Sequence, residues 1–207
     1  MVSDPKKTFL VTSQGRSGTV WLSHALRDGA VRGWEIVHEP KNYYPFGGIK
    51  GNLGVVDGSR RHNPWLCMEK DTKLGIILRR PHDLTRSAIA RNPEKWKGPR
   101  FARKNWRNWW LPDLIKTLAA LDSHVQKDGV IVIRFELMVT DDEYLWSVAH
   151  GLGINEFDVE KVDFSPKNSS PIGEIPAAIQ DEADSVCNWF TKKYWDADGQ
   201  PIGLGVP

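Results

Sequence analysis

The sequence has 207 residues, enough for one domain with a full hydrophobic core. Hydrophobic residues make up 40% of it and charged residues 26%, which is ordinary for a soluble globular protein. The formal net charge of +2 is too small to indicate, by itself, a protein that binds nucleic acid or a membrane surface.

The cysteines and the start of the chain bear on the cellular compartment. Cys67 and Cys187 are the only cysteines; they lie far apart and have no metal-ligand neighbours. They provide neither a disulfide framework nor a zinc pattern, so we expect free thiols in a reducing compartment. Residues 1–10 lack the apolar stretch of a signal peptide, and no window approaches the length of a membrane span. The sequence therefore predicts a soluble, cytoplasmic protein.

Predicted strands and helices alternate along the chain. The strands, each an apolar run, span approximately 7–13, 34–37, 74–78 and 130–135. The helices, recognised from apolar spacing and from Pro, Asp or Gly at their ends, span approximately 18–28, 81–91, 112–129, 141–152 and 176–195. The Gly- and Pro-containing segments 41–70 and 95–110 are predicted to be irregular. This alternation predicts one α/β domain over residues 1–207, with a central, mainly parallel sheet flanked by helices.

The loop after the first strand, Ser13 to Thr19, combines features that suit an anion. A glycine-bearing turn between a strand and a helix directs backbone N–H groups and the positive end of the helix dipole at one point. Arg16, Ser17 and Thr19 add a positive charge and two hydroxyls. The loop is therefore predicted to bind a phosphate-like group.

Charged residues also follow two other predicted strands. Glu39 comes after the second strand and Arg79 after the third, as Arg16 comes after the first. Ligands of parallel α/β sheets bind at the carboxyl ends of the strands. We therefore expect these three side chains to lie along one rim of the sheet.

The loop does not fit a nucleoside triphosphate. An ATP or GTP loop has the form G-x-x-x-x-G-K-[ST], in which Lys contacts the outer phosphates and Ser or Thr contacts magnesium. Here Gly18 is followed by Thr19, with no Lys between them. The nearest candidate for a magnesium-binding Asp, Asp57, is expected in a Gly-rich loop. A small-molecule kinase is thus the weaker alternative.

Two motifs, in order, resemble those of sulfotransferases that use 3′-phosphoadenosine-5′-phosphosulfate (PAPS). The first, [KR]-S-G-[TS]-x-[WFL] after the first strand, matches residues 16–21. The second, an Arg at a strand end with a Ser eight positions later, matches Arg79 and Ser87. Residues 131–154, with Glu136-Leu137 and a later Leu-Gly, fit the next strand and helix of that family. The resemblance implies a P-loop-like, three-layer fold and is nearer to the carbohydrate or bacterial type than to the cytosolic phenol type.

The resemblance also implies how PAPS, and the product 3′-phosphoadenosine-5′-phosphate (PAP), would be bound. The implied cofactor-binding residues are Gly15, Arg16, Ser17, Gly18, Thr19, Val20, Trp21, Arg79, Ser87 and, with the poorest motif match, Lys167. The loop would hold the 5′-phosphosulfate, Arg79 and Ser87 the 3′-phosphate, and Trp21 would lie near the adenine. Arg16 would stabilise the leaving oxygen by its charge, because an arginine does not give up its proton. No metal is required.

Transfer to an acceptor hydroxyl needs a general base. Glu39 stands at about the distance from Arg16 at which heparan-modifying relatives place a catalytic Glu, so we favour Glu39, with His38 second. The alternative is that Glu39 pairs with a nearby Arg and that His38 is structural.

The expected acceptor is a carbohydrate or another small molecule, and a homo-oligomer is compatible with the short chain. The mixture of basic and aromatic residues between Trp96 and Trp110 also occurs in single-strand nucleic-acid sites. These tryptophans would otherwise bind the acceptor or pack as a lid over the core. A non-catalytic nucleic-acid-binding module is therefore a second alternative; the small net charge favours neither nucleic acid nor a membrane as partner.

Overall fold

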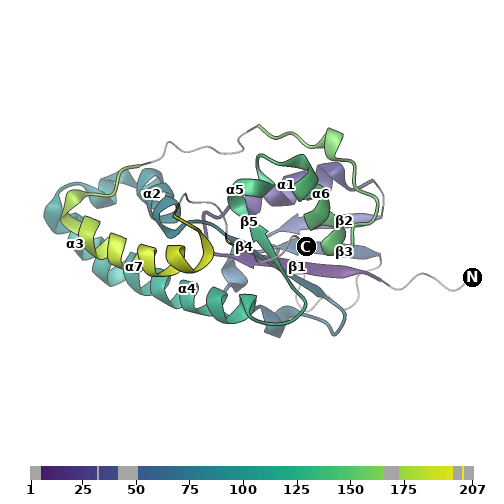
Figure 1. Ribbon diagram of the computed structural model, residues 1–207, viewed down its shortest axis with the longest axis horizontal. Coiled ribbons are helices and arrows are strands. Elements are labelled where there is room, and N and C mark those ends of the chain that lie inside the picture. Colours follow the sequence, from purple (N-terminus) through teal and green to yellow (C-terminus); the bar gives the residue numbers. More distant parts are fainter. Residues whose placement is uncertain (1–5, 32, 42–50, 166–172, 198–201, 203–207) are drawn as a thin grey trace, which may run out of the picture.

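The computed structural model describes residues 6–31, 33–41, 51–165, 173–197 and 202. Its centre is a sheet of five parallel strands in the order β2-β3-β1-β4-β5 (Figure 1). The strands are β1 (Thr8–Ser13), β2 (Trp34–His38), β3 (Asn52–Val56), β4 (Lys73–Leu78) and β5 (Val130–Arg134). β1 and β4 are inner strands with mostly buried side chains, which explains their apolar sequences. The predicted α/β fold with a parallel sheet is confirmed.

Helices connect and cover these strands. The α-helices are α1 (Thr19–Gly29), α2 (Pro81–Arg91), α3 (Pro99–Asn105), α4 (Leu111–Val125), α5 (Phe135–Met138), α6 (Asp142–Gly151) and α7 (Gln180–Tyr194). Short 3-10 helices are η1 (Gly58–Arg60), η2 (Pro64–Cys67), η3 (Pro93–Trp96), η5 (Val159–Lys161) and η6 (Ala177–Ile179), and η4 (Trp106–Trp110) is a π-helical turn. None of the described helices is long and apolar enough to cross a membrane.

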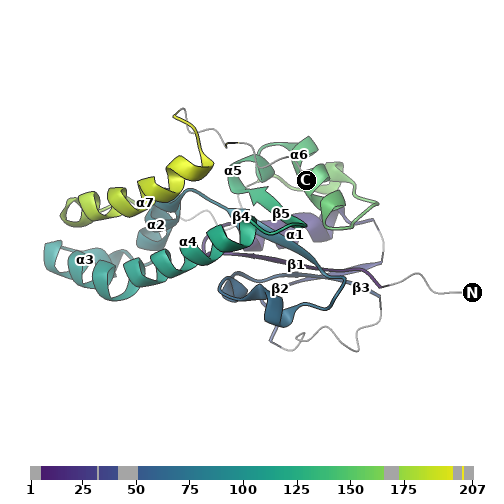
Figure 2. The ribbon, with the colours of Figure 1, turned by 60° about the horizontal axis from the view of Figure 1, so that its bottom comes forward.

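The fold has three layers, a sheet between two groups of helices, and an apolar core lies on each side of the sheet. One core joins the sheet to α1, α5 and α6, and the other joins it to α2, α4 and α7. Figures 1 and 2 both show α2, α3 and α7 beyond the end of the sheet at which β1 ends, with α3 farthest out. The carboxyl ends of the strands, where a ligand is expected, therefore face this group of helices.

The strand β3 lies inside the segment that the sequence predicts to be irregular. It pairs with β1 on one side and β2 on the other. Its central Gly54 is required by packing, because an added Cβ atom would lie only 2.1 Å from the Phe9 ring. A glycine selected by a contact with another strand looks, in the sequence, like part of a loop, and this prediction was wrong.

Residues 99–125 are also more regular than predicted. Gly98, with φ of 77°, precedes Pro99 at the first helical turn, so these two residues begin a helix instead of interrupting one. α3, the π-helical turn and α4 then follow without a break. Burial of Trp106 and Trp110 in the core holds the turn in place.

Cys187, on α7, is fully buried. Burial raises the pKa of its thiol to about 12. Because the thiolate is the reactive form, we expect Cys187 of the native protein to resist iodoacetamide at pH 8 and to react fully in denaturant. Peptide mass mapping checks this; alkylation of the native protein at the rate of a free cysteine would contradict the packing of α7.

Candidate functional site

The loop between β1 and α1 has an unusual backbone. Arg16 has a positive φ of 77°, and Gly18, which precedes the first residue of α1, has φ of 85°. The carbonyl oxygen of Gln14 accepts hydrogen bonds from the Ser17 N–H at 3.2 Å and from its hydroxyl at 2.5 Å, which closes the turn. An added Cβ at Gly15 would meet no heavy atom within 4 Å, so a ligand has room to approach the backbone there.

Arg79 and Ser87, from the second motif, meet this loop directly. Arg79 Nη1 donates to the carbonyl oxygen of Arg16 at 2.6 Å, and Arg16 Nε donates to Ser87 Oγ at 3.2 Å. Arg79 lies just after β4, and Ser87 lies on the following helix, α2. The fold therefore brings together three predicted site residues from distant parts of the sequence.

Phe135, which sequence reasoning missed, supports both parts of this cluster. Its ring lies 4.2 Å from the Arg79 guanidinium and faces Gly18, where an added Cβ would be 2.4 Å from a ring atom. The residue directly follows β5 and precedes the Glu136-Leu137 pair used as a motif. Its aromatic character was the available signal, but the neighbours that give it a role come from other parts of the chain.

The close contact between Gly18 and Phe135 gives a prediction for stability. Changing Gly18 to Ala places a side chain at positive φ and against an aromatic ring. We expect the free energy of unfolding to fall by about 2–4 kcal/mol, measured by chemical denaturation. Gly15→Ala is the matched control, expected to change it by less than about 1 kcal/mol, because the added methyl group meets open space. Equal effects of the two changes would contradict the described packing.

The end of β2 supplies a second set of polar groups beside the loop. His38 Nε2 lies 3.1 Å from Thr19 Oγ1 and 3.8 Å from Glu39 Oε1. The Glu39 side chain is 50% exposed. The backbone N–H of Glu39 donates a hydrogen bond to the carbonyl oxygen of Val56, at the end of β3. Glu39 has a positive φ of 46°. The carboxylate is thus next to the loop and open to an incoming molecule.

Trp21 and Phe164 form an aromatic pair on the α1 side of the site. Their ring centroids are 5.7 Å apart, and Trp21 is almost fully buried while Phe164 is half-buried. Val20, between the loop and Trp21, is also half-buried. Lys167 lies outside the described residues.

The electrostatic character of the site is cationic. Burial lowers the pKa of Arg79, and burial together with the charge of Arg91 lowers the pKa of Arg16. Arginine starts from a pKa so high that both remain charged at neutral pH. Two guanidinium groups held close together favour a ligand with more than one negative charge.

Asp57 and the possible metal ligands bear on the kinase alternative. Asp57 directly follows β3, which pairs with β1, so the expectation that it lies within a Gly-rich loop is corrected. Its Oδ1 accepts from the N–H and the hydroxyl of Ser59, where it caps η1. Among the described residues, no three His, Cys, Asp or Glu side chains gather as a metal site.

Comparison with known proteins gives similarity in structure only. No family model matches the sequence, and no curated protein matches it. A sulfotransferase from Alicyclobacillus acidocaldarius aligns with a TM-score of 0.62 at 15% identity, over 91% of this chain and 94% of that one. Mouse sulfotransferase SULT7A1, solved with PAP, aligns with a TM-score of 0.53 at 15% identity, over 84% of this chain and 73% of that one. The chain therefore has a sulfotransferase-like fold, as the two motifs predict.

Proposed function

We propose that this chain is a sulfotransferase that moves the sulfuryl group of PAPS to an acceptor hydroxyl. The observation that carries the proposal is the cluster of Arg16, Arg79 and Ser87, whose side chains and backbone are hydrogen-bonded to one another. A nucleotide with phosphate groups at both its 5′ and 3′ positions needs two anion sites side by side. ATP has no 3′-phosphate and therefore does not need the second anion site.

The residues present fit the nucleotide at each end. The open backbone at Gly15 and the start of α1 suit the 5′-phosphosulfate. Arg79 and Ser87 offer a guanidinium fork and a hydroxyl to the 3′-phosphate. The Trp21 and Phe164 rings, beside α1, offer an apolar flank to the adenine.

The chemistry requires positioning and charge more than covalent assistance. In an in-line transfer, the acceptor oxygen attacks sulfur, the bond from sulfur to the bridging oxygen breaks, and PAP leaves. Arg16 would stabilise the negative charge that develops on that bridging oxygen. Glu39 would accept the proton of the acceptor hydroxyl, and His38, held at Thr19, is the second candidate for this role. The proposal needs no metal ion.

We infer that the acceptor is a carbohydrate or another small molecule. The enzyme is proposed to be cytoplasmic and not to act on nucleic acid or at a membrane. A homo-oligomer is compatible with this function. A row of exposed aromatic rings would favour nucleic acid. Here Trp96, Trp106 and Trp110 are 4%, 0% and 6% exposed, so these three pack in the core and leave Trp109 as the exposed tryptophan of the segment 96–110. This supports the core-packing alternative over a base-stacking platform.

Thermal-shift titration separates the candidate functions. PAP is expected to raise the melting temperature, while ATP with magnesium and single-stranded oligonucleotide leave it unchanged. Labelled PAPS with a panel of hydroxyl acceptors, with and without EDTA, then identifies the transfer reaction. Stabilisation by ATP with magnesium and none by PAP would overturn the proposal in favour of the kinase. Stabilisation by the oligonucleotide alone would favour the nucleic-acid module.

A further inference from the structure

The positive charge of the chain is concentrated in one short segment. Residues 95–107 hold six of the 28 basic residues and none of the 26 acidic ones, so the rest of the chain is net acidic. We call these six the basic strip; all are exposed, and they are Lys95, Lys97, Arg100, Arg103, Lys104 and Arg107. The strip covers η3, α3 and the π-helical turn, at the end of the molecule farthest from the sheet (Figures 1 and 2).

The strip is carried on a firmly packed support. Trp96, Ala102 and Trp106, interspersed among the basic residues, are 4%, 0% and 0% exposed and belong to the core shared with α2, α4 and α7. The backbone of a surface on such a support needs little ordering when a ligand binds. The burial of the apolar side chains therefore fixes how the charges are presented.

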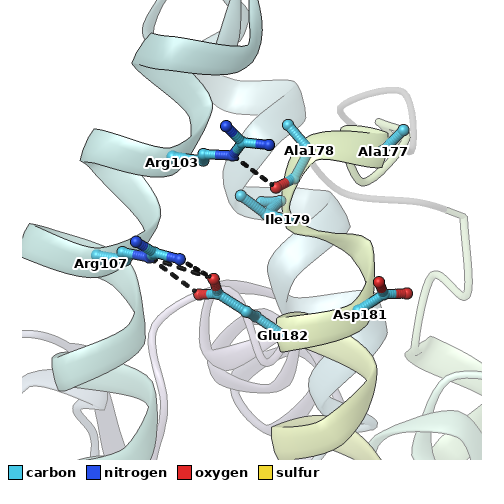
Figure 3. A pocket seen from close by; sticks show the side chains of 7 residues that line it. All are labelled: Arg103, Arg107, Ala177, Ala178, Ile179, Asp181 and Glu182. Carbon is cyan, nitrogen blue, oxygen red and sulfur yellow. Dashed lines mark hydrogen bonds and ion pairs between the residues drawn. The ribbon is translucent and has the colours of Figure 1, made fainter.

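Part of the strip borders a pocket against the start of α7 (Figure 3). The pocket has a volume of about 240 Å³ and is lined by Arg103 and Arg107 on one side and by residues 177–179, Asp181 and Glu182 on the other, so its formal charges balance. Arg107 pairs with Glu182, and Arg103 Nε donates to the carbonyl oxygen of Ala178 at 3.3 Å. The outer Nη groups of Arg103 form no hydrogen bond with other described residues.

Some charges of the strip have a partner among the described residues and others have none. Lys97 pairs with Glu94, as Arg107 does with Glu182, and Lys95 lies over the Trp109 ring. Arg100 and Lys104 have no ion-pair partner among the described residues. An exposed run of this kind attracts polyanions by releasing their counterions.

We propose that the basic strip binds an anionic sugar polymer, one with sulfate or carboxylate groups along it. Three of the six basic residues are arginines, which pair with sulfate and carboxylate through two parallel hydrogen bonds. The surface beside the strip is hollowed by this pocket, unlike the flat surface of a bilayer. Three of the four tryptophans are buried, so the exposed rings of the segment, Phe101 and Trp109, do not form the continuous stacking surface that single-stranded nucleic acid uses. If the proposed function holds, this polymer is the acceptor or carries it; binding itself does not depend on that function.

The test measures binding of the full-length protein to heparin, polygalacturonate and neutral dextran at several salt concentrations. We expect both anionic polymers to bind, dextran not to bind, and affinity to fall steeply with salt. Arg100→Glu/Lys104→Glu is expected to weaken heparin binding about tenfold or more. Lys73→Glu/Lys192→Glu makes the same change of charge at exposed sites outside the strip and is expected to change it less than about twofold.

Two further measurements make the result decisive. The melting temperature and PAP binding of the strip variant are expected to match the wild type, which separates this proposal from the proposed function. Equal losses in both double variants would overturn the proposal, since they would indicate attraction to the overall charge. Tighter binding to poly(dT), or to vesicles of phosphatidylcholine and phosphatidylserine, than to either sugar polymer would also overturn it.

Discussion

Replacement of Arg79 by alanine is expected to weaken PAP binding by about 100-fold or more, because charge-assisted hydrogen bonds to the 3′-phosphate are lost. The substitution also removes the hydrogen bond to the Arg16 carbonyl oxygen and the cation that lies over the Phe135 ring. Isothermal titration of the variant with PAP measures the effect.

Two further variants serve as comparisons for the PAP affinity of Arg79→Ala. Arg79→Lys retains the charge without the guanidinium fork, so its affinity for PAP should lie between those of the wild type and Arg79→Ala. Arg27→Ala removes an exposed arginine from the opposite end of α1 and should leave PAP binding unchanged. PAP affinity of Arg79→Ala within threefold of wild type, with the fold intact, would reject Arg79 as a 3′-phosphate ligand.

Replacement of Glu39 by glutamine is expected to lower kcat for sulfuryl transfer by about 100- to 10,000-fold and to leave PAP binding unchanged. Glutamine preserves the size of the side chain and its reach toward the acceptor but does not take up a proton. Steady-state kinetics with labelled PAPS, together with PAP titration, separates the loss of chemistry from a loss of binding.

The same measurements on two other variants identify the base. Glu35→Gln removes an exposed carboxylate from the same strand, β2, and should retain full activity. His38→Gln is expected to lower kcat less than Glu39→Gln does, because His38 Nε2 already contacts the Thr19 hydroxyl. A larger loss in His38→Gln than in Glu39→Gln would transfer the role of base to His38.

The residues of the candidate site whose positions in the fold could be expected from the sequence are those with local signals. Arg16, Glu39 and Arg79 each follow a strand, and two of these strands are plain apolar runs. Because parallel strands align their carboxyl ends, the shared rim could be expected without knowing the order of the strands. The direct contact between Arg16 and Ser87, a residue on α2, was not predicted.

What the sequence could not supply depends on contacts between distant segments. Phe135 has its role because Gly18 and Arg79 lie on either side of its ring, and neither neighbour can be inferred from its own surroundings in the chain. β3 was missed because Gly54 is selected by Phe9. The helix that begins at Pro99 was missed because its stability comes from tryptophans buried against other helices.

If Arg16 and Glu39 have the proposed roles, their positive φ angles mean that activity and stability favour different residues at these two positions. A side chain in this region of backbone space costs about 1–2 kcal/mol, which glycine avoids. Selection for stability alone would therefore replace both residues by glycine and remove the cation and the carboxylate together. Under the proposed function, glycine at both positions of a relative would therefore indicate that the relative lacks the transfer activity.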